Sequence, residues 1–167
     1  RPDNATVVLA DTWNAQVVLY DLTTGAVLAT LATAAQPWSL DISRDGTIAA
    51  VGHTPVANAI TKLDLVTRTV AATFPVDGAY GKVVRITADN QYALVPIDNN
   101  VVFVDLATGA TAATLFTGAV GDIELSYDGK YAFVSNSLAA VIDVASKTIV
   151  ATLPLEACDE AAVSPTD

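Results

Sequence analysis

A short phrase built around an aspartate returns four times along this 167-residue chain and constrains its fold more than any other feature. In each copy an apolar segment ends at the aspartate, and a few small or polar residues follow it. The four aspartates, spaced 43, 41 and 38 residues apart, are Asp21, Asp64, Asp105 and Asp143. A period near ~40 residues is typical of solenoids and propellers, whose cores form between neighbouring copies of one supersecondary unit. The sequence therefore predicts one such unit, repeated.

A turn signal and a strand signal also recur inside the repeats. The turn signal is an Asp-Gly or Asp-Asn pair, which supplies the positive φ of a two-residue hairpin loop, at 45–46, 89–90 and 128–129. The strand signal is an Ala-Thr pair followed by a large apolar residue, at 29–31, 72–74, 113–115 and 151–153. Together the two signals divide each repeat into short antiparallel strands.

The second repeat predicts four strands, each rich in Val, Ile, Thr and Ala and bounded by Gly, Pro, Asp or Asn. They are Trp38–Ser43, Ile48–His53, Ala59–Asp64 and Thr69–Pro75. No long segment free of turn signals has the apolar spacing of a helix, so we expect almost no helix. The predicted fold is an all-β propeller of four-stranded antiparallel blades, in which both faces of each sheet are buried between neighbouring blades.

The four blades are expected to form one domain over residues 1–167. Their approximate bounds are 1–35 together with 156–167, 36–77, 78–117 and 118–155. Because the first blade has only three strands of its own, Ala161–Ser164 is expected to supply its innermost strand and so to close the ring. Three arrangements remain open: a four-bladed ring formed by one chain, half of an eight-bladed ring completed by a second copy, and part of a longer chain.

Three segments resemble the YVTN-type propeller repeat: Asp105–Leu115, Val141–Leu155 and Ser126–Asn136. That repeat has an aspartate-led turn and a Val-Ala-Thr strand, followed by a Ser-Pro-Asp-Gly turn and a Tyr-Val-Thr-Asn strand. The resemblance extends over essentially the whole chain and implies the propeller fold. It implies no single activity, because similar repeats occur in surface-layer proteins, secreted binding proteins, lactonase-like enzymes and propellers attached to haem or quinone domains.

Charge and hydropathy narrow the range of partners. Eighteen acidic and eight basic residues give a formal net charge of −10, which would repel a nucleic-acid backbone. Apolar residues make up 52% of the chain but come in short runs, far below the ~20 residues of a membrane-spanning helix. We therefore expect no nucleic-acid partner and no membrane insertion. The acidic composition suits a secreted, periplasmic or cell-surface protein, and a single cysteine, Cys158, excludes an internal disulfide.

The loops that join one blade to the next, together with the loops inside the blades on the same side, form the usual binding face of a propeller. We call this side the loop face. Aromatic rings beside polar groups on it would suit a small ligand or a peptide. The residues expected there are Trp13, Trp38, His53, Tyr80, Lys82 and Asn136. In the alternative interpretation the tryptophans fill the mouth of the ring, and His53, the sole histidine, makes a structural hydrogen bond.

Acidic side chains near the starts of the innermost strands are candidates for a cation site. Asp122, Asp159 and Glu160 carry the oxygen ligands that calcium prefers, but they lack the spacing of a calcium-binding loop. Solvated acidic loops are the alternative interpretation.

A second group of charges lies on the innermost strands themselves. Alignment of these strands on their terminal hydroxyl residues places Asp41, Arg85 and Glu124 at one equivalent position. A partly buried arginine needs paired acceptors, so the three residues predict a charge-compensated ladder near the axis. An anion contact at Arg85 is the alternative.

No catalytic motif stands out, because the chain has no Gly-x-Ser-x-Gly elbow, phosphate-binding loop, paired-cysteine zinc spacing or His-Glu-x-x-His. We expect a noncatalytic binding or assembly module without a cofactor, which engages a protein partner, a second copy or a small ligand through its loop face. The alternative is a lactonase-like or cofactor-associated propeller enzyme with an acidic calcium (Ca²⁺) site on the axis. A third possibility is one lobe of a larger ring whose blade edges are the functional surface.

Overall fold

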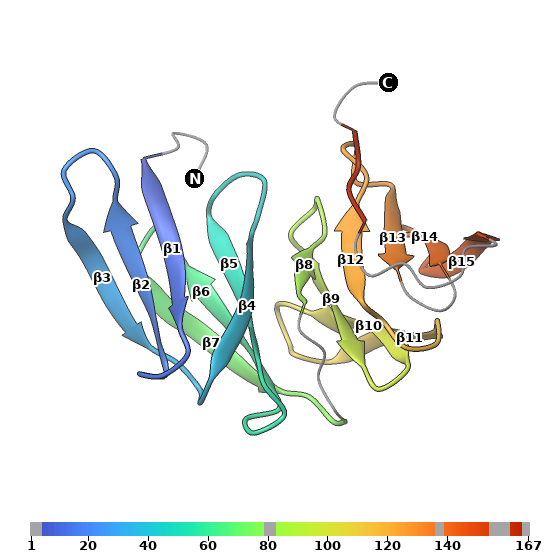
Figure 1. The fold of residues 1–167 in the computed structure, drawn as a ribbon, viewed down its shortest axis with the longest axis horizontal. Coiled ribbons are helices and arrows are strands. Elements are labelled where there is room, and N and C mark those ends of the chain that lie inside the picture. The colour runs from blue at the N-terminus through green and yellow to red at the C-terminus, as the bar shows by residue number, and fades with distance from the viewer. Residues whose placement is uncertain (1–4, 79–82, 136–138, 154–160, 165–167) are drawn as a thin grey trace.

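The computed structural model describes residues 5–78, 83–135, 139–153 and 161–164. Over these residues the chain forms fifteen β-strands and no helix, and hence no helix long and apolar enough to cross a membrane. The strands pair antiparallel in four sheets and follow the chain order within each sheet (Figure 1).

The first sheet has three strands and the other three have four each. In chain order, the first sheet contains β1 (Thr6–Asp11), β2 (Gln16–Asp21) and β3 (Val27–Ala32). The second contains β4 (Pro37–Ile42), β5 (Ile48–His53), β6 (Ala59–Asp64) and β7 (Thr69–Pro75). The third contains β8 (Arg85–Ile86), β9 (Tyr92–Ile97), β10 (Asn100–Asp105) and β11 (Thr111–Phe116). The fourth contains β12 (Asp122–Leu125), β13 (Tyr131–Ser135), β14 (Ala139–Asp143) and β15 (Thr148–Leu153).

The second sheet forms almost as the sequence predicts. β5, β6 and β7 have the predicted bounds, because turn residues end each apolar run. β4 begins one residue earlier than predicted and contains a β-bulge, since Pro37 pairs with His53 and Ser39 pairs with Gly52. Trp38 is therefore the extra residue of the bulge. The prediction of an all-β fold built from repeated antiparallel blades is confirmed.

The repeated aspartates are turn residues. Asp105 Oδ1 accepts hydrogen bonds from the backbone N–H groups of Ala107 and Thr108, each at 2.8 Å. Asp21 and Asp64 accept the same two bonds from residues two and three positions ahead. These bonds favour the ionised carboxylate and hold the pKa of each of the three side chains below its usual value. The phrase thus recurs at the period of the fold because it builds the same hairpin in each sheet.

Apolar side chains on both faces hold the sheets against one another. Each of the three interfaces between successive sheets buries one cluster of side chains. From the first interface to the third, representative members are Leu19 and Leu63, Ile60 and Val104, and Phe103 and Ile142. The sheets are therefore stacked face to face, as blades are.

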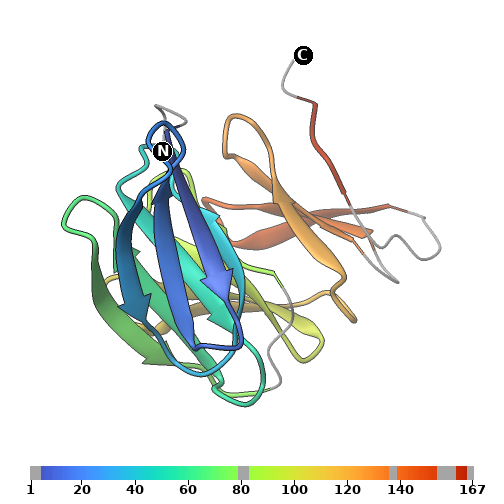
Figure 2. The same cartoon turned by 60° about the vertical axis from the view of Figure 1, so that its left-hand side comes forward.

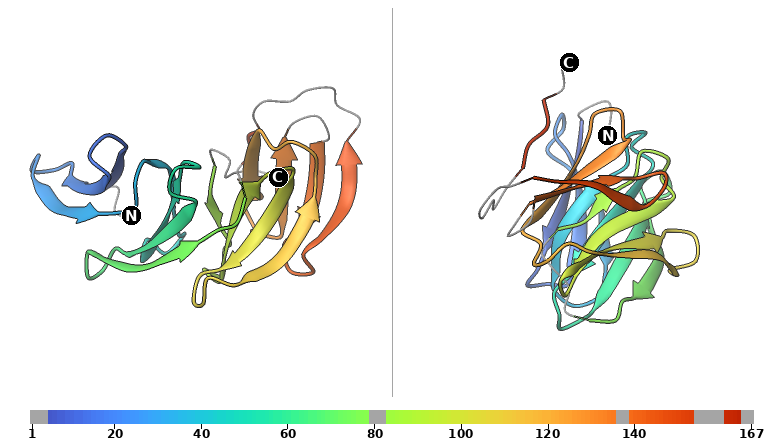
Figure 3. Two further views of the ribbon diagram at one scale, coloured as in Figure 1. Left: turned by 90° about the horizontal axis from the view of Figure 1, so that it is seen from below. Right: turned by 90° about the vertical axis from the view of Figure 1, so that its right-hand side faces the viewer.

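The four sheets follow one another in an arc (Figures 1 and 3). The first strand of each four-stranded sheet contacts the first strand of the next, so β4, β8 and β12 mark the inner edge of the arc. Figure 2, which brings the first sheet forward, shows no other sheet in front of it. Among the described residues, one face of the first sheet and one face of the fourth are thus left without a neighbouring sheet.

The described residues do not form a closed ring. Residues 161–164, expected as the innermost strand of the first sheet, belong to no sheet. They lie at the end of the arc opposite to the first sheet (Figures 1 and 2). In this structure residues 161–164 therefore do not make the expected pairing with the first sheet, because three successive sheet-to-sheet steps turn the chain through only part of a circle (Figure 3). The three arrangements of the ring stay open.

Two glycines at equivalent turn positions give a test of this packing. Gly25 and Gly109 both have positive φ, at 72° and 76°. A Cβ added at Gly25 meets nothing within 4 Å, whereas one added at Gly109 would overlap the ring of Phe74, which is buried in the core between the second and third sheets.

We therefore expect Gly109→Ala to destabilise the protein more than Gly25→Ala. Both variants carry the cost of a left-handed alanine, about 1–2 kcal/mol. Gly109→Ala adds an overpacking cost of about 1–3 kcal/mol. Urea unfolding followed by circular dichroism measures both free energies, and equal losses would contradict the described contact between the second and third sheets.

Candidate functional site

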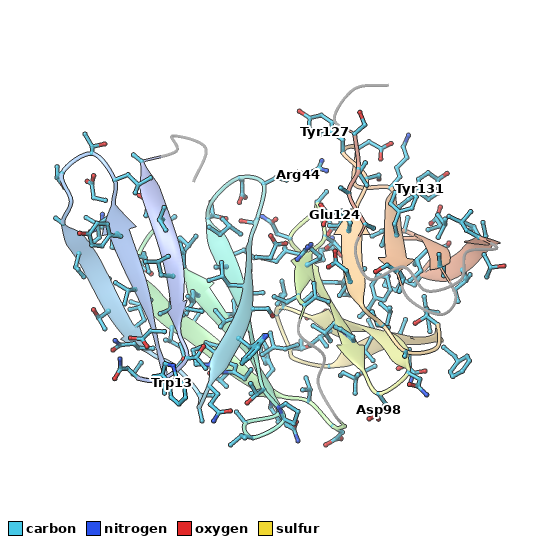
Figure 4. All side chains as sticks on the ribbon, in the orientation of Figure 1. Trp13, Arg44, Asp98, Glu124, Tyr127 and Tyr131 are labelled. Atoms are coloured by element: carbon cyan, nitrogen blue, oxygen red, sulfur yellow. The ribbon has the colours of Figure 1, made fainter. Side chains whose placement is uncertain are left out.

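Two exposed tryptophans lie in segments that a hydrogen bond joins. Trp13, in the turn between β1 and β2, is 95% exposed, and Trp38 on β4 is 49% exposed. Thr12 Oγ1 donates a hydrogen bond of 2.7 Å to the backbone oxygen of Pro37, the residue before Trp38. The bond fixes the β1–β2 turn against the start of β4, at the end of the molecule where Figure 4 also places Asp98.

The turn that presents Trp13 is held by Asp11. The Asp11 carboxylate accepts bonds from the side-chain amides of Asn14 and Gln16, at 2.7 and 2.9 Å. These bonds lower the pKa of the Asp11 carboxyl, because they favour its charged form. Trp13 therefore extends from a turn with a defined shape. Trp38 is the extra residue of the bulge in β4, a feature that commonly re-aims a side chain.

Trp13 adjoins an apolar surface on the first sheet. An open hollow of about 550 Å³ is lined by residues of β1, β2, β3 and the β1–β2 turn. We call the apolar part of this lining the Trp13 surface and define it by Leu9, Trp13, Val18, Tyr20 and Val27. Leu9 is 49% and Val27 58% exposed.

We did not predict Leu9, Tyr20 or Val27 as site residues, although the repeat contains a signal for Leu9 and Tyr20. Leu9 is equivalent by spacing to Val51, and Tyr20 is equivalent to Leu63. Both equivalents are completely buried by the first sheet. An apolar residue at a position that is buried elsewhere in the repeat marks a face that needs a neighbour.

His53 does not lie on the loop face. It is the last residue of β5 and is completely buried. Its Nδ1 lies 3.1 Å from the backbone oxygen of Ala35, which can only accept, so Nδ1 carries the proton. Its Nε2 lies 2.8 Å from Thr61 Oγ1 and accepts from that hydroxyl. Burial lowers the pKa of His53 and keeps the ring neutral. The prediction that His53 contacts a ligand is therefore wrong, and its role is a structural hydrogen bond.

Five of the predicted site residues lie outside the described residues: Tyr80, Lys82, Asn136, Asp159 and Glu160. Their parts in a ligand or calcium site stay predictions. The third residue of the predicted calcium site, Asp122, is described, and its Oδ1 lies 3.4 Å from Arg85 Nη2. Among the described residues, no three His, Cys, Asp or Glu side chains are grouped so that they would hold a metal ion.

Arg85 joins the third and fourth sheets near the axis. Its Nε donates to Glu124 Oε2 at 3.0 Å, and its Nη2 lies at 3.0 Å from the same oxygen. Its Nη1 donates to the backbone oxygen of Val84 at 3.1 Å. Arg85 therefore contacts two carboxylates of β12, those of Asp122 and Glu124, which compensate its charge.

The role of Asp41 differs from the charge ladder that its position, equivalent to those of Arg85 and Glu124, predicts. Its Oδ2 accepts a hydrogen bond of 2.8 Å from the backbone N–H of Ile86, and its Oδ1 accepts one of 2.9 Å from Ile42. The carboxylate thus joins β4 to β8 through the backbone. Burial raises the pKa of Asp41, although the Ile86 bond and the nearby Arg85 charge oppose the shift.

Comparison with known proteins gives the fold. No protein-family model matches this chain, and no curated protein matches its sequence. Among solved structures, the hydrazine synthase of Kuenenia stuttgartiensis is similar with a TM-score of 0.77 at 20% identity. The dihydro-heme d1 dehydrogenase NirN, in complex with DHE, has a TM-score of 0.76 at 22% identity. The fold is that of a β-propeller.

This chain matches only a part of each of these two structures. It covers 92% of this chain and 52% of the hydrazine synthase chain, and 94% of this chain and 37% of the NirN chain. The chain thus spans about half of the first structure and just over a third of the second. At these identities the likeness shows the fold alone.

Asp41 gives a pH-dependent test of the group at the axis. Because the pKa of folded Asp41 is raised, its contribution to stability is fully present below the unfolded pKa of ~3.9 and is lost as pH rises through the folded pKa. An amide oxygen keeps an acceptor for Ile86 and cannot ionise. We expect the stability of Asp41→Asn, relative to wild type, to improve between pH 4 and pH 7 in denaturant titrations.

Asp45 serves as the control with the opposite sign. Bonds from Ser43 and Thr47 lower the pKa of Asp45 to about 2, so its contribution to stability is present above ~3.9 and is lost as pH falls toward 2. The deficit of Asp45→Asn should therefore shrink in acid. A difference between Asp41→Asn and wild type that does not change with pH would contradict the burial of that carboxylate.

Proposed function

We propose that this chain is a noncatalytic binding and assembly module of propeller type, which engages a protein partner through the Trp13 surface and the adjoining loop face. The observation that carries the proposal is the side-by-side exposure of Trp13, Leu9 and Val27 on one side of the first sheet. A contiguous apolar patch of this kind typically marks an interaction site. Tryptophan is also among the residues that contribute most at protein interfaces.

The chemistry of the polar groups supports a noncatalytic role. Both ring nitrogens of His53 are used within the protein, and Arg85 compensates the charges of Asp122 and Glu124. Among the described residues, the groups that the sequence offered for acid–base or cation chemistry, His53 and Asp122, are thus engaged in contacts within the protein. The resemblance to YVTN-type repeats and the net charge of −10 support a secreted, periplasmic or cell-surface location.

A protein partner suits the surface better than a small ligand does. The hollow of about 550 Å³ has the volume of a ligand pocket, but it lies open on a sheet face and is lined mainly by aliphatic and aromatic side chains. A surface of this shape buries its apolar atoms only against another broad surface.

Combined replacement of Trp13 and Trp38 by alanine tests the proposal. Immobilised wild-type protein and variants are exposed to extracts of the source cells, and retained proteins are quantified by mass spectrometry. We expect a partner that stays bound to the wild type to be retained at least tenfold less by Trp13→Ala/Trp38→Ala, because truncation of an interface tryptophan costs about 2 kcal/mol or more.

Tyr127→Ala is the matched control. Tyr127 is an aromatic residue with 72% exposure, and it lies at the other end of the molecule from Trp13 (Figure 4). The control should retain the partner as the wild type does. Equal retention by the double tryptophan variant would contradict the proposed surface, and a stoichiometric divalent ion in native mass spectra would favour the enzyme alternative.

A further inference from the structure

The first sheet lacks the strand that each of the other sheets has at its inner edge. By spacing from the Asp-Gly and Asp-Asn turns, β1 is equivalent to β5, β9 and β13. Each of those strands pairs on one side with an innermost strand, which is β4, β8 or β12. Within the described residues, β1 pairs with β2 alone. Its inner edge therefore has the backbone groups of a sheet edge without the strand that the repeat provides elsewhere.

Residues 161–164 have the sequence of that missing strand. Each innermost strand is followed by a hydroxyl residue that bonds to the aspartate of the turn: Ser43 to Asp45, Thr87 to Asp89 and Ser126 to Asp128, at 2.6–2.7 Å. Ser164 is the corresponding residue of the last segment, and Ala161 to Val163 precede it as Leu40 to Ile42 precede Ser43. In this structure the segment lies at the far end of the arc from β1 (Figure 1).

We call the face of a sheet toward the preceding sheet its front and the face toward the following sheet its back. The front of the first sheet, which carries the Trp13 surface, has the composition of a blade interface. Leu9 is equivalent to Val51, Val95 and Val134, and each of these three valines is buried against the preceding sheet. Tyr20 is equivalent to Leu63, Val104 and Ile142, which are buried in the same way. The first sheet thus keeps the residues for a preceding sheet, which the described residues do not supply.

The back of the fourth sheet shows the complementary pattern. Phe133 is equivalent to Leu94, and Val141 is equivalent to Phe103. Leu94 and Phe103 are completely buried in the core between the third and fourth sheets, whereas Phe133 and Val141 are only partly buried. The fourth sheet therefore has the face that receives a following sheet.

We propose that a second copy of this chain covers both faces, so that two copies form a two-fold ring of eight blades. The back of the fourth sheet of each copy packs on the front of the first sheet of the other, and residues 161–164 of each copy pair with β1 of the other. The inference rests on the proposed assembly function and names its partner. A second copy fits because the chain itself packs this back against this front three times, and the interface between copies continues that series.

The repeat also fixes the register of the exchanged strand. In the second sheet Leu40 pairs with Val51, and Ile42 pairs with Ala49. The equivalent pairs across the two copies are Ala161 with Leu9 and Val163 with Val7. Directly opposed residues of antiparallel strands have Cα atoms about 4.5–5.5 Å apart, which lies within the range of about 4.4–6.8 Å found for disulfides.

Cysteine cross-linking tests this register. In a Cys158→Ser background, Leu9→Cys/Ala161→Cys is oxidised under mild conditions, with equal amounts of ¹⁴N- and ¹⁵N-labelled protein mixed beforehand. We expect a species of twice 17.2 kDa on non-reducing gels and cross-linked peptides that join the two isotopes. Val7→Cys/Val163→Cys is a second pair in the same register, which keeps the test valid if the first variant fails to fold.

Val27→Cys/Ala161→Cys is the matched control, because Val27 is as accessible as Leu9 on the same face but lies on β3, two strands further from the inner edge. It should give little cross-linking. The inference is overturned if the control cross-links equally, if both in-register pairs fail in folded protein, or if the disulfide forms within a single chain. The proposed function is tested separately in each of these cases, because the retention experiment measures whether a different protein binds through Trp13 and Trp38.

Discussion

The structure depends on one constraint: a sheet that is apolar on both faces must have another sheet packed on each side. In β10 four consecutive residues, Val101 to Val104, are all buried, so no face of that strand is left for water. Burial of each such side chain stabilises the fold by about 1.5–3 kcal/mol. The inner sheets satisfy the constraint within the chain. The first and fourth sheets are each covered on one face only. The uncovered face of the first sheet carries the candidate functional surface.

Local chemistry explains why so much of the fold could be predicted. The turn residues that end β5, β6 and β7 act through their own backbone, as the bonds from Asp64 show, so their effect is visible in the sequence without knowledge of the partner sheets. The contact of Arg85 with Glu124 could also be predicted, because equivalent positions on neighbouring blades come close together. The bond from Ile86 to Asp41 could not be predicted, since its donor is a backbone N–H, which every residue except proline carries.

The candidate site was harder to predict because burial there is decided by neighbours far away in the chain. His53 ends a predicted strand and was expected beside the loops, yet it is buried and bonds to Ala35 and Thr61. Leu9 and Tyr20 resemble core residues of any other blade, and only the absence of a sheet in front of them makes them a surface. Residues 161–164 have the sequence of an innermost strand, but the arc does not bring them to β1.

We infer that a second copy of this chain covers the two open faces of the arc. Light scattering across a concentration series, at a salt concentration that screens the net charge of −10, tests this inference. We expect a mass that rises with concentration from 17.2 kDa to twice that value and then stops, because a two-fold ring leaves no further open face. A mass of 17.2 kDa at every concentration would contradict it.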